Sequence, residues 1–170
     1  MNFPAVHLIP LAVCLLIAAI WDVSARRIPN AVCGAIAVAG LGAQFWDAGA
    51  LRAVGGLGAA AITVALLYVF WRRGGIGGGD VKLAGAVATW VGPWSLPTYW
   101  LATALAGGGI AAICLLASQK AARQEIRLNL TLAAYHQMIP TVGPARTERM
   151  SVPYGVAIAA GAVFVWWHGA

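Results

Sequence analysis

The chain has 170 residues, of which 61% are hydrophobic and only 9% are charged, and its mean hydropathy is +0.81. So few charged side chains cannot cover the surface of a water-soluble globule. The composition therefore excludes that class and indicates a protein whose solvent is the lipid bilayer. The formal net charge of +6 would suit a nucleic-acid partner, but the positions of the basic residues indicate membrane topology instead.

Five stretches contain no Asp, Glu, Lys or Arg, and each can cross about 30 Å of hydrocarbon, which takes about 20 helical residues. The fourth stretch has about twice that length, and the segment 92–97, Gly-Pro-Trp-Ser-Leu-Pro, is a reverse-turn signal in its middle. The residues before the first apolar run, Met1-Asn2-Phe3, include no Lys or Arg, so we expect this segment to remain as a helix rather than act as a signal peptide. We predict an all-α membrane protein of six transmembrane helices, forming one domain over residues 1–170. The stretches are Met1–Trp21, Ile28–Trp46, Ala53–Trp71, Leu83–Gln119 and Met150–Ala170.

The basic residues cluster in alternate connections between the predicted helices. All except Arg52 follow the first stretch, flank the junction of the third and fourth stretches, or precede the last stretch. The positive-inside rule places these three connections in the cytosol and both termini outside. We therefore expect a multi-pass protein of the bacterial inner membrane. The clustered residues are Arg26, Arg27, Arg72, Arg73, Lys82, Lys120, Arg123, Arg127, Arg146 and Arg149.

The longest polar stretch, Ser118 to Arg149, precedes the last predicted helix. Apolar residues recur in it at helical spacing from Leu128 to Ile139, and basic residues fall on another face. This pattern predicts an amphipathic helix along the cytosolic interface. The alternative is a cytosolic cap with no special role.

The cysteines indicate neither a metal site nor a disulfide framework. Cys14, Cys33 and Cys114 all lie in apolar stretches, with no CxxC pair and no histidine at ligand spacing. We therefore expect no cofactor, no bound metal, and buried, unreactive thiols.

The three aspartates differ in their predicted sidedness. Asp47 lies on the outer side near Arg52, where a solvated loop charge is the ordinary outcome. Asp22 ends the first predicted helix as that helix reaches the cytosol, and Asp80 opens the fourth predicted helix as it leaves the cytosol, so we expect both at the same membrane depth. An acid at the bilayer edge is costly to desolvate and tends to be paired or functional. The structural alternative is that Asp22 pairs with Arg26 and that Asp80 caps its own helix.

A glycine run, Gly74-Gly75-Ile76-Gly77-Gly78-Gly79, precedes Asp80. Glycines at so many positions permit positive φ and let another backbone come close to the following side chain. A phosphate-binding Walker loop would end in Gly-Lys-Ser/Thr, whereas this run ends in a carboxylate that would repel phosphate. Nucleotide binding is therefore not expected.

Three short segments carry recognisable motifs. Gly77-Gly78-Gly79-Asp80 matches a GxGD motif, and the run continues as Val-Lys-Leu to Leu83. A second segment, Asp22 to Asn30, has an aspartate followed by a basic pair and Ile-Pro-Asn, and Val152 to Ala157 contains Pro-Tyr-Gly. Together, in this order, the segments resemble the type IV prepilin peptidases, which are polytopic GxGD aspartyl peptidases. GxGD alone is a weak signal, but with the six-helix layout the resemblance covers nearly the whole chain.

The resemblance implies a membrane aspartyl endopeptidase with Asp22 and Asp80 as its catalytic pair. Two close carboxyls share a proton, so one activates water while the protonated one binds the carbonyl oxygen and later helps to protonate the leaving amine. The implied substrates are prepilins, which hold an apolar helix in the bilayer and a basic leader in the cytosol. The chain lacks the cytosolic segment with paired CxxC motifs found in bifunctional members. It is similar instead to the short, peptidase-only branch associated with Flp-type pilins of tight-adherence systems.

The other motif residues are expected to shape the site. The glycine run would leave room for the substrate backbone and let the following helix shift as the aspartates close. A local structural role is expected first for Arg26, Arg27 and Lys82, although a base beside an aspartyl pair could tune its pKa. The full set is Gly77, Gly78, Gly79, Lys82, Arg26, Arg27, Pro29, Asn30, Pro153, Tyr154 and Gly155.

Two other functions remain open. One is a non-catalytic membrane subunit or scaffold in which the aspartates cap helices. The other is a GxGD protease that cuts within a substrate helix, like the signal peptide peptidases. Those enzymes combine GxGD with a Pro-Ala-Leu segment, where this chain has Pro153-Tyr154-Gly155.

Overall fold

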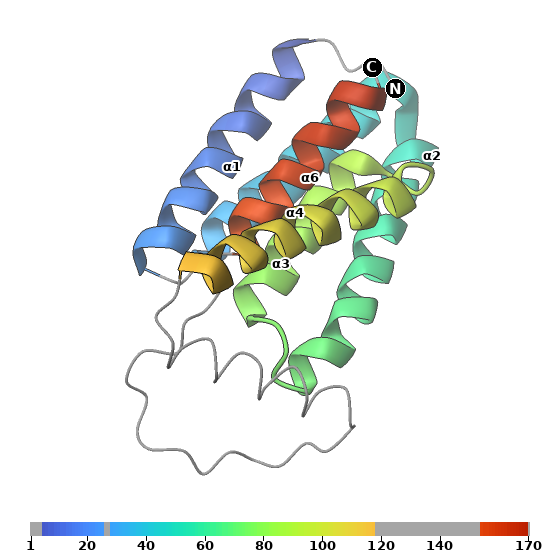
Figure 1. Ribbon diagram of the computed structural model, residues 1–170. Helices are drawn as coiled ribbons and strands as arrows, with labels where there is room; N and C mark the ends of the chain where they lie inside the picture. Colours follow the sequence, from blue (N-terminus) through green and yellow to red (C-terminus); the bar gives the residue numbers. More distant parts are fainter. Residues whose placement is uncertain (1–4, 26–27, 118–153, 170) are drawn as a thin grey trace. The chain divides into compact units, whose positions relative to one another are not determined.

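A computed structural model describes residues 5–25, 28–117 and 154–169 (Figure 1). Within these ranges every regular element is a helix, which confirms the all-α prediction. The helices are α1 (Ala5–Ala25), α2 (Asn30–Arg72), α3 (Gly78–Val91), α4 (Leu96–Ala117) and α6 (Tyr154–Gly169). The predicted amphipathic helix before α6 lies outside the described residues.

The chain divides into two compact units, residues 1–107 with 153–170, and residues 108–152. Of the second unit, the structure describes only the end of α4, from Gly108 to Ala117. The first unit carries all of the contacts described below. That residues 1–170 act as one peptidase domain stays a prediction.

The second and third predicted helices are joined in one long element, α2. This element, from Asn30 to Arg72, consists of two helical limbs that meet at a kink, where only Ala48 (φ −148°, ψ 17°) and Gly49 (φ 77°, ψ −177°) leave the helical conformation. Glycine adopts positive φ without a steric penalty, so two residues are enough to turn the chain here. The predicted outer connection from Trp46 to Ala53 is therefore wrong in length, because a two-residue break separates two limbs of a single helix (Figure 1).

Two of the described helices, α2 and α4, are long and apolar enough to cross a membrane. The apolar parts of α1 (Ile9–Asp22) and α6 (Tyr154–His168) are shorter. Large hydrophobic side chains also face outward, including Trp46 and Leu51, which are 83% and 86% exposed. Such a surface suits lipid rather than water. The six-span topology stays a prediction.

The predicted reverse turn separates α3 from α4. Gly92, at positive φ (70°), ends α3 and donates its N–H to the Ala88 carbonyl at 3.0 Å. The chain then reverses, and α4 begins at Leu96. Glycine adopts a positive φ without a steric penalty, so the chain can turn at Gly92, and the predicted split of the fourth stretch is confirmed.

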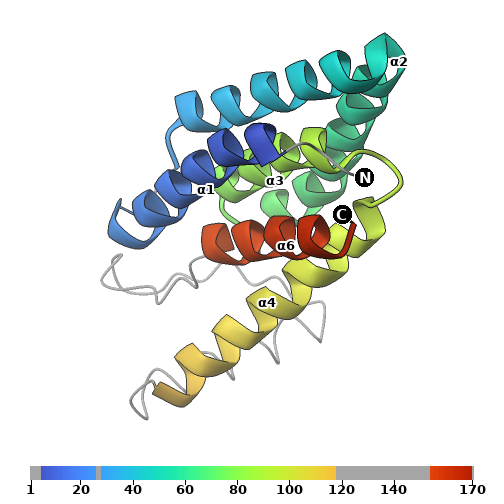
Figure 2. The ribbon, with the colours of Figure 1, turned by 90° about the horizontal axis from the view of Figure 1, so that it is seen from above.

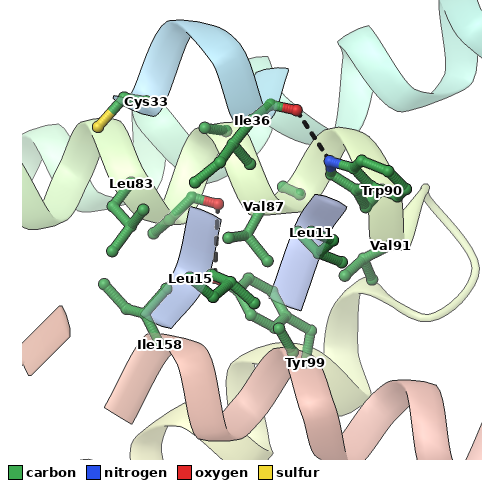
Figure 3. Packing of buried hydrophobic residues seen from close by; sticks show 14 of the residues in the cluster. Leu11, Leu15, Cys33, Ile36, Leu83, Val87, Trp90, Val91, Tyr99 and Ile158 are labelled. Carbon is green, nitrogen blue, oxygen red and sulfur yellow. Dashed lines mark hydrogen bonds between the residues drawn. The ribbon is translucent and has the colours of Figure 1, made fainter. Parts of the chain in front are cut away.

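The core is built around α3, which packs most extensively on α2 and then on α6, while α1 covers α2 and α6 (Figure 2). Every residue of α3 from Val81 to Val91 is buried except Lys82. Leu83 and Val87 are fully buried, and around them lie Leu15 of α1, Ile36 of α2 and Ile158 of α6 (Figure 3). Small side chains along α3 let the neighbouring helices come close.

Polar contacts fix the C-terminal end of α3 to α2. Gln44 Nε2 donates to the carbonyl oxygens of Thr89 and Trp90, at 3.1 Å each, and Trp90 Nε1 donates to the Ile36 carbonyl at 2.8 Å. The last carbonyls of a helix lack partners within it, so Gln44 caps α3 from another helix. Gly40 makes the approach possible, because a Cβ there would lie 2.6 Å from Trp90 Cδ1. We call Gly40, Gln44, Thr89 and Trp90 the α2–α3 clamp.

Candidate active site

The two aspartates singled out from the sequence lie at the same end of the helices. Asp22 is in the last turn of α1, and Asp80 is in the first turn of α3. In Figure 1, α1 ends and both α3 and α6 begin at the lower end of the bundle. The site therefore combines residues from three helix termini.

The Asp22 carboxylate accepts a hydrogen bond from the start of α6. The Gly155 N–H donates to Asp22 Oδ2 at 2.7 Å. The first N–H groups of a helix have no acceptor within the helix, so Asp22 caps α6 from outside and stabilises it. A Cβ on Gly155 would lie 2.8 Å from Asp22 Oδ2, 3.0 Å from its Cβ and 3.1 Å from its Cγ. Only glycine leaves room for this contact.

Asp80 is the third residue of α3, ahead of the apolar stretch that begins at Leu83. Burial raises the pKa of its carboxyl to about 6; the negative charge of Asp22 adds to the increase, and hydrogen bonding to the Gly77 backbone opposes it. The contribution of Asp22 means that the two carboxyls interact electrostatically. A Cβ on Gly77 would lie 2.8 Å from Asp80 Oδ2. Each aspartate thus lies against a glycine that cannot be enlarged without moving its carboxyl.

A side-chain hydrogen bond joins the two aspartate segments. Lys82 Nζ donates to Asn30 Oδ1 at 3.0 Å, which ties α3 to the first residue of α2. Pro29 precedes this residue in an extended conformation and accepts the N–H of Val32 at 3.1 Å. The local structural role expected for Lys82 is consistent with this bond.

Gly78 and Gly79, at the end of the run, lie against other parts of the chain. A Cβ on Gly79 would lie 3.5 Å from Ile28, so the glycine run passes against the second motif segment. A Cβ on Gly78 would lie 3.1 Å from the indole Nε1 of Trp71. The glycines therefore let the chain pack closely around the start of α3.

Of the Pro-Tyr-Gly segment, Gly155 contacts an aspartate of the candidate site, and Tyr154 contacts another helix. Gly155 bonds to Asp22, whereas the half-buried Tyr154 ring lies near Gly107 of α4, where a Cβ would be 3.4 Å from Tyr154 Cε1. Pro153, Arg26 and Arg27 lie outside the described residues. Sequence reasoning included Gly155 in the site but did not find its contact with Asp22, which is 133 positions away.

The side chains that could take part in catalysis at this site are two carboxylic acids, Asp22 and Asp80. Among residues 5–25, 28–117 and 154–169, no group of three or more His, Cys, Asp or Glu side chains could hold a metal ion. An ionised carboxyl beside a protonated one can act as general base and general acid in hydrolysis.

The sequence profile of the type IV leader peptidase family matches residues 9–112, more than half of the chain, including both aspartates. The chain belongs to the type IV leader peptidase family. Membership implies a peptidase, with prepilins as its class of substrate. A search of curated proteins found no significant match, and a search of solved structures found none either. The family match ends before Gly155. The hydrogen bond between Gly155 and Asp22 in this leader peptidase is therefore known from the structure alone.

Proposed function

We propose that this leader peptidase is a membrane aspartyl endopeptidase that removes the basic leader of Flp-type prepilins, with Asp22 and Asp80 as its catalytic pair. The observation that carries the proposal is that Asp22, in the last turn of α1, and Asp80, in the first turn of α3, lie at the same end of the helix bundle. They are 58 positions apart in the sequence of a chain whose family consists of leader peptidases. The site lies on the cytosolic face of the inner membrane in this proposal, as the positive-inside rule predicts.

Asp22 is the general base. The hydrogen bond that its Oδ2 accepts from Gly155 N–H, at 2.7 Å, holds this carboxylate at the start of α6. An ionised carboxylate takes a proton from water as the water oxygen attacks the carbonyl carbon of the scissile bond. The carbonyl π electrons move to oxygen, giving a tetrahedral intermediate.

Asp80 is the general acid. Its raised pKa keeps it protonated to a higher pH than an ordinary aspartate. The protonated carboxyl donates a hydrogen bond to the carbonyl oxygen, where negative charge develops. When the intermediate collapses and the C–N bond breaks, the carboxyl pair supplies the proton that the leaving amine takes up.

The position of the pair suits a substrate that crosses the membrane boundary. A prepilin holds its apolar helix in the bilayer and its basic leader in the cytosol. Its scissile bond then lies at the level of Asp22 and Asp80, so cleavage requires no unfolding of a globular domain.

The decisive test is processing of a co-expressed Flp-type pilin precursor. Asp22→Asn and Asp80→Asn should each reduce processing by about 10³-fold or more, because neither remaining carboxyl can act alone as base and acid. Asp47→Asn, on an exposed aspartate of α2, is the matched control and should process normally. Membrane accumulation of each variant is measured by immunoblot.

Three outcomes would contradict the proposal. Normal cleavage by Asp22→Asn or by Asp80→Asn would show that the aspartate is not catalytic. The aspartates would then only cap helices, as in a non-catalytic subunit. A new N-terminus in the middle of the substrate helix, instead of at the cytosolic boundary, would favour a protease that cuts within helices. Loss of wild-type activity on chelation of divalent ions would favour a metal-dependent mechanism.

A further inference from the structure

An open groove of about 390 Å³ lies where the two limbs of α2 meet α3. Its walls carry mostly small apolar residues: Gly34 and Ala37 from the first limb, Ala60 from the second limb, and Gly85 and Ala86 from α3. Asn30 and Lys82 line it at one end. Apart from these two and Thr89, the lining side chains are apolar.

The polar end of the groove lies at the same end of the helix bundle as the aspartates. Asn30 and Lys82, joined by their hydrogen bond, lie at the starts of α2 and α3, the end of the bundle that holds Asp80. Cys33 also lines the groove, one helical turn beyond Asn30. From Asn30 the lining continues along α2 to Leu41, a length of about 16 Å at 1.5 Å per helical residue. The groove therefore has its polar end at the end of the bundle that carries the candidate active site.

We propose that this groove receives the membrane helix of the precursor and aligns its scissile bond with the aspartates; this inference rests on the proposed function. An apolar wall offers no hydrogen-bond partners, so its occupant must satisfy its own backbone, as a helix does. Small lining residues allow a second helix backbone to come close. In this arrangement the apolar helix of the precursor lies in the groove. Its polar leader begins at the Lys82 end, and the bond between the two parts is presented to the aspartates.

The direction of the bound helix follows from the substrate. Its N-terminal end, next to the leader, must lie at the Asn30 and Lys82 end of the groove. The first limb of α2 and α3 both begin at that end. The substrate helix therefore runs parallel to both of them, and about 11 of its residues fill the lined length.

Two glycines of α2 provide a matched test. A Cβ on Gly34 or on Gly42 would meet no atom within 4 Å, and both residues are exposed, but only Gly34 lines the groove. Gly34→Leu should raise the KM for the full-length precursor by about tenfold with little change in kcat, because a side chain fills the docking space. Gly42→Leu should stay within about twofold of wild type. Equal kinetics of the two variants, in a wild type that cleaves the precursor, would overturn the groove proposal while leaving the proposed function intact.

Cross-linking gives an independent readout that does not depend on turnover. Gly34→Cys and Gly42→Cys are compared in a chain carrying Cys14→Ser, Cys33→Ser and Cys114→Ser, with Asp80→Asn to keep the precursor uncut. Gly34→Cys should form disulfides with single cysteines placed three or four residues apart along the precursor helix, and Gly42→Cys should not. Two results would overturn the proposal. One is the absence of any disulfide with the precursor, and the other is a disulfide between two copies of the peptidase whose yield is unchanged when the precursor is present. Failure of the wild-type chain to process any precursor would instead count against the proposed function.

Discussion

The two ends of α3 are held in different ways. At its C-terminal end, the α2–α3 clamp joins the helix to α2 through three hydrogen bonds of 2.8–3.1 Å and a close approach at Gly40. At its N-terminal end, the helix follows a glycine run, and its side-chain hydrogen bond to α2 is that of exposed Lys82 with Asn30. The end that carries Asp80 is thus the more weakly restrained of the two.

We infer from this difference that one end of α3 contributes mainly to the stability of the fold and that the other end carries a residue of the proposed catalytic pair. The clamp fixes the register of α3 on α2, far from the aspartates. The Asp80 end has fewer hydrogen bonds to α2 than the clamp end, so we expect the distance between the carboxyls to adjust at a smaller cost in free energy when a substrate binds. Changes at the N-terminal end should therefore affect catalysis, and changes at the clamp should affect folding.

The largest effect is expected at Gly155, the partner of Asp22 at the catalytic end. Gly155→Ala would place a methyl group against the Cβ and Cγ of Asp22 as well as its carboxylate, so rotation of the carboxylate alone cannot relieve the contact. A catalytic group displaced by about 1 Å can lose about 100-fold in rate, and we expect a loss of that order in kcat/KM. Purified variants in detergent or nanodiscs are assayed with the precursor.

Gly58→Ala is the control for this change, because a Cβ on Gly58 would meet no atom within 4 Å. It should leave kcat/KM within about twofold of wild type. Equal activity of Gly155→Ala and Gly58→Ala would show that the contact with Asp22 does not position the carboxylate for catalysis.

A second prediction concerns the clamp. Gly40→Ala would force a methyl group against the Thr89 hydroxyl and the Trp90 ring, and overpacking of this kind costs about 1–3 kcal/mol. We expect a lower free energy of unfolding with a nearly unchanged kcat in the folded fraction. Thermal unfolding in detergent measures the first quantity. Gly42→Ala, where no atom lies within 4 Å, is the matched control, and a loss of kcat without a loss of stability would contradict the separation of the two ends.

The pH dependence should report the catalytic end alone. Because the pKa of Asp80 is about 6 and the mechanism needs it protonated, kcat/KM should fall as the pH rises above that value, by about tenfold per unit. Below pH 6 the Asp80 carboxyl is already mostly protonated, so further acidification should not increase kcat/KM through this group. A kcat/KM that increases between pH 6 and pH 8 would contradict the assignment of Asp80 as the acid.

The smallest effect is expected at Gln44. Gln44→Leu removes two hydrogen bonds to the carbonyls of Thr89 and Trp90 and keeps a similar side-chain volume. Hydrogen bonds between membrane helices average about 0.6 kcal/mol, so the free energy of unfolding should fall by about 1 kcal/mol. Unfolding of the variant is compared with wild type in the same detergent, and a change in kcat that exceeds the change in stability would argue against a purely structural clamp.

Local features of the chain could be predicted from its sequence. Apolar stretches predicted helices, and the glycine and prolines between residues 92 and 97 predicted the turn between α3 and α4. The two aspartates were found because charge is rare in such a chain. The length of the connection at residues 47–52 was predicted wrongly, because Asp47 and Arg52 indicate a loop although only Ala48 and Gly49 leave the helical conformation.

Long-range contacts could not be predicted in the same way. The bond from Gly155 to Asp22, the clamp at Gln44 and the groove beside Gly34 all depend on which helix faces are brought together. No periodicity in the sequence specifies that choice, because the helices are apolar on nearly all sides. The candidate catalytic residues were thus visible in the sequence, whereas their supports were not.

The bond between Asp22 and Gly155 also has a consequence for biogenesis. Asp22 is synthesised early, and its N–H donor is synthesised 133 residues later, at the start of α6. A nascent chain that has inserted α1 through α4 already holds both aspartates but lacks the group that orients one of them. In the proposed mechanism, the Asp22 and Asp80 pair is therefore complete only when α6 has joined the other helices, and a partly assembled chain should not cleave precursors.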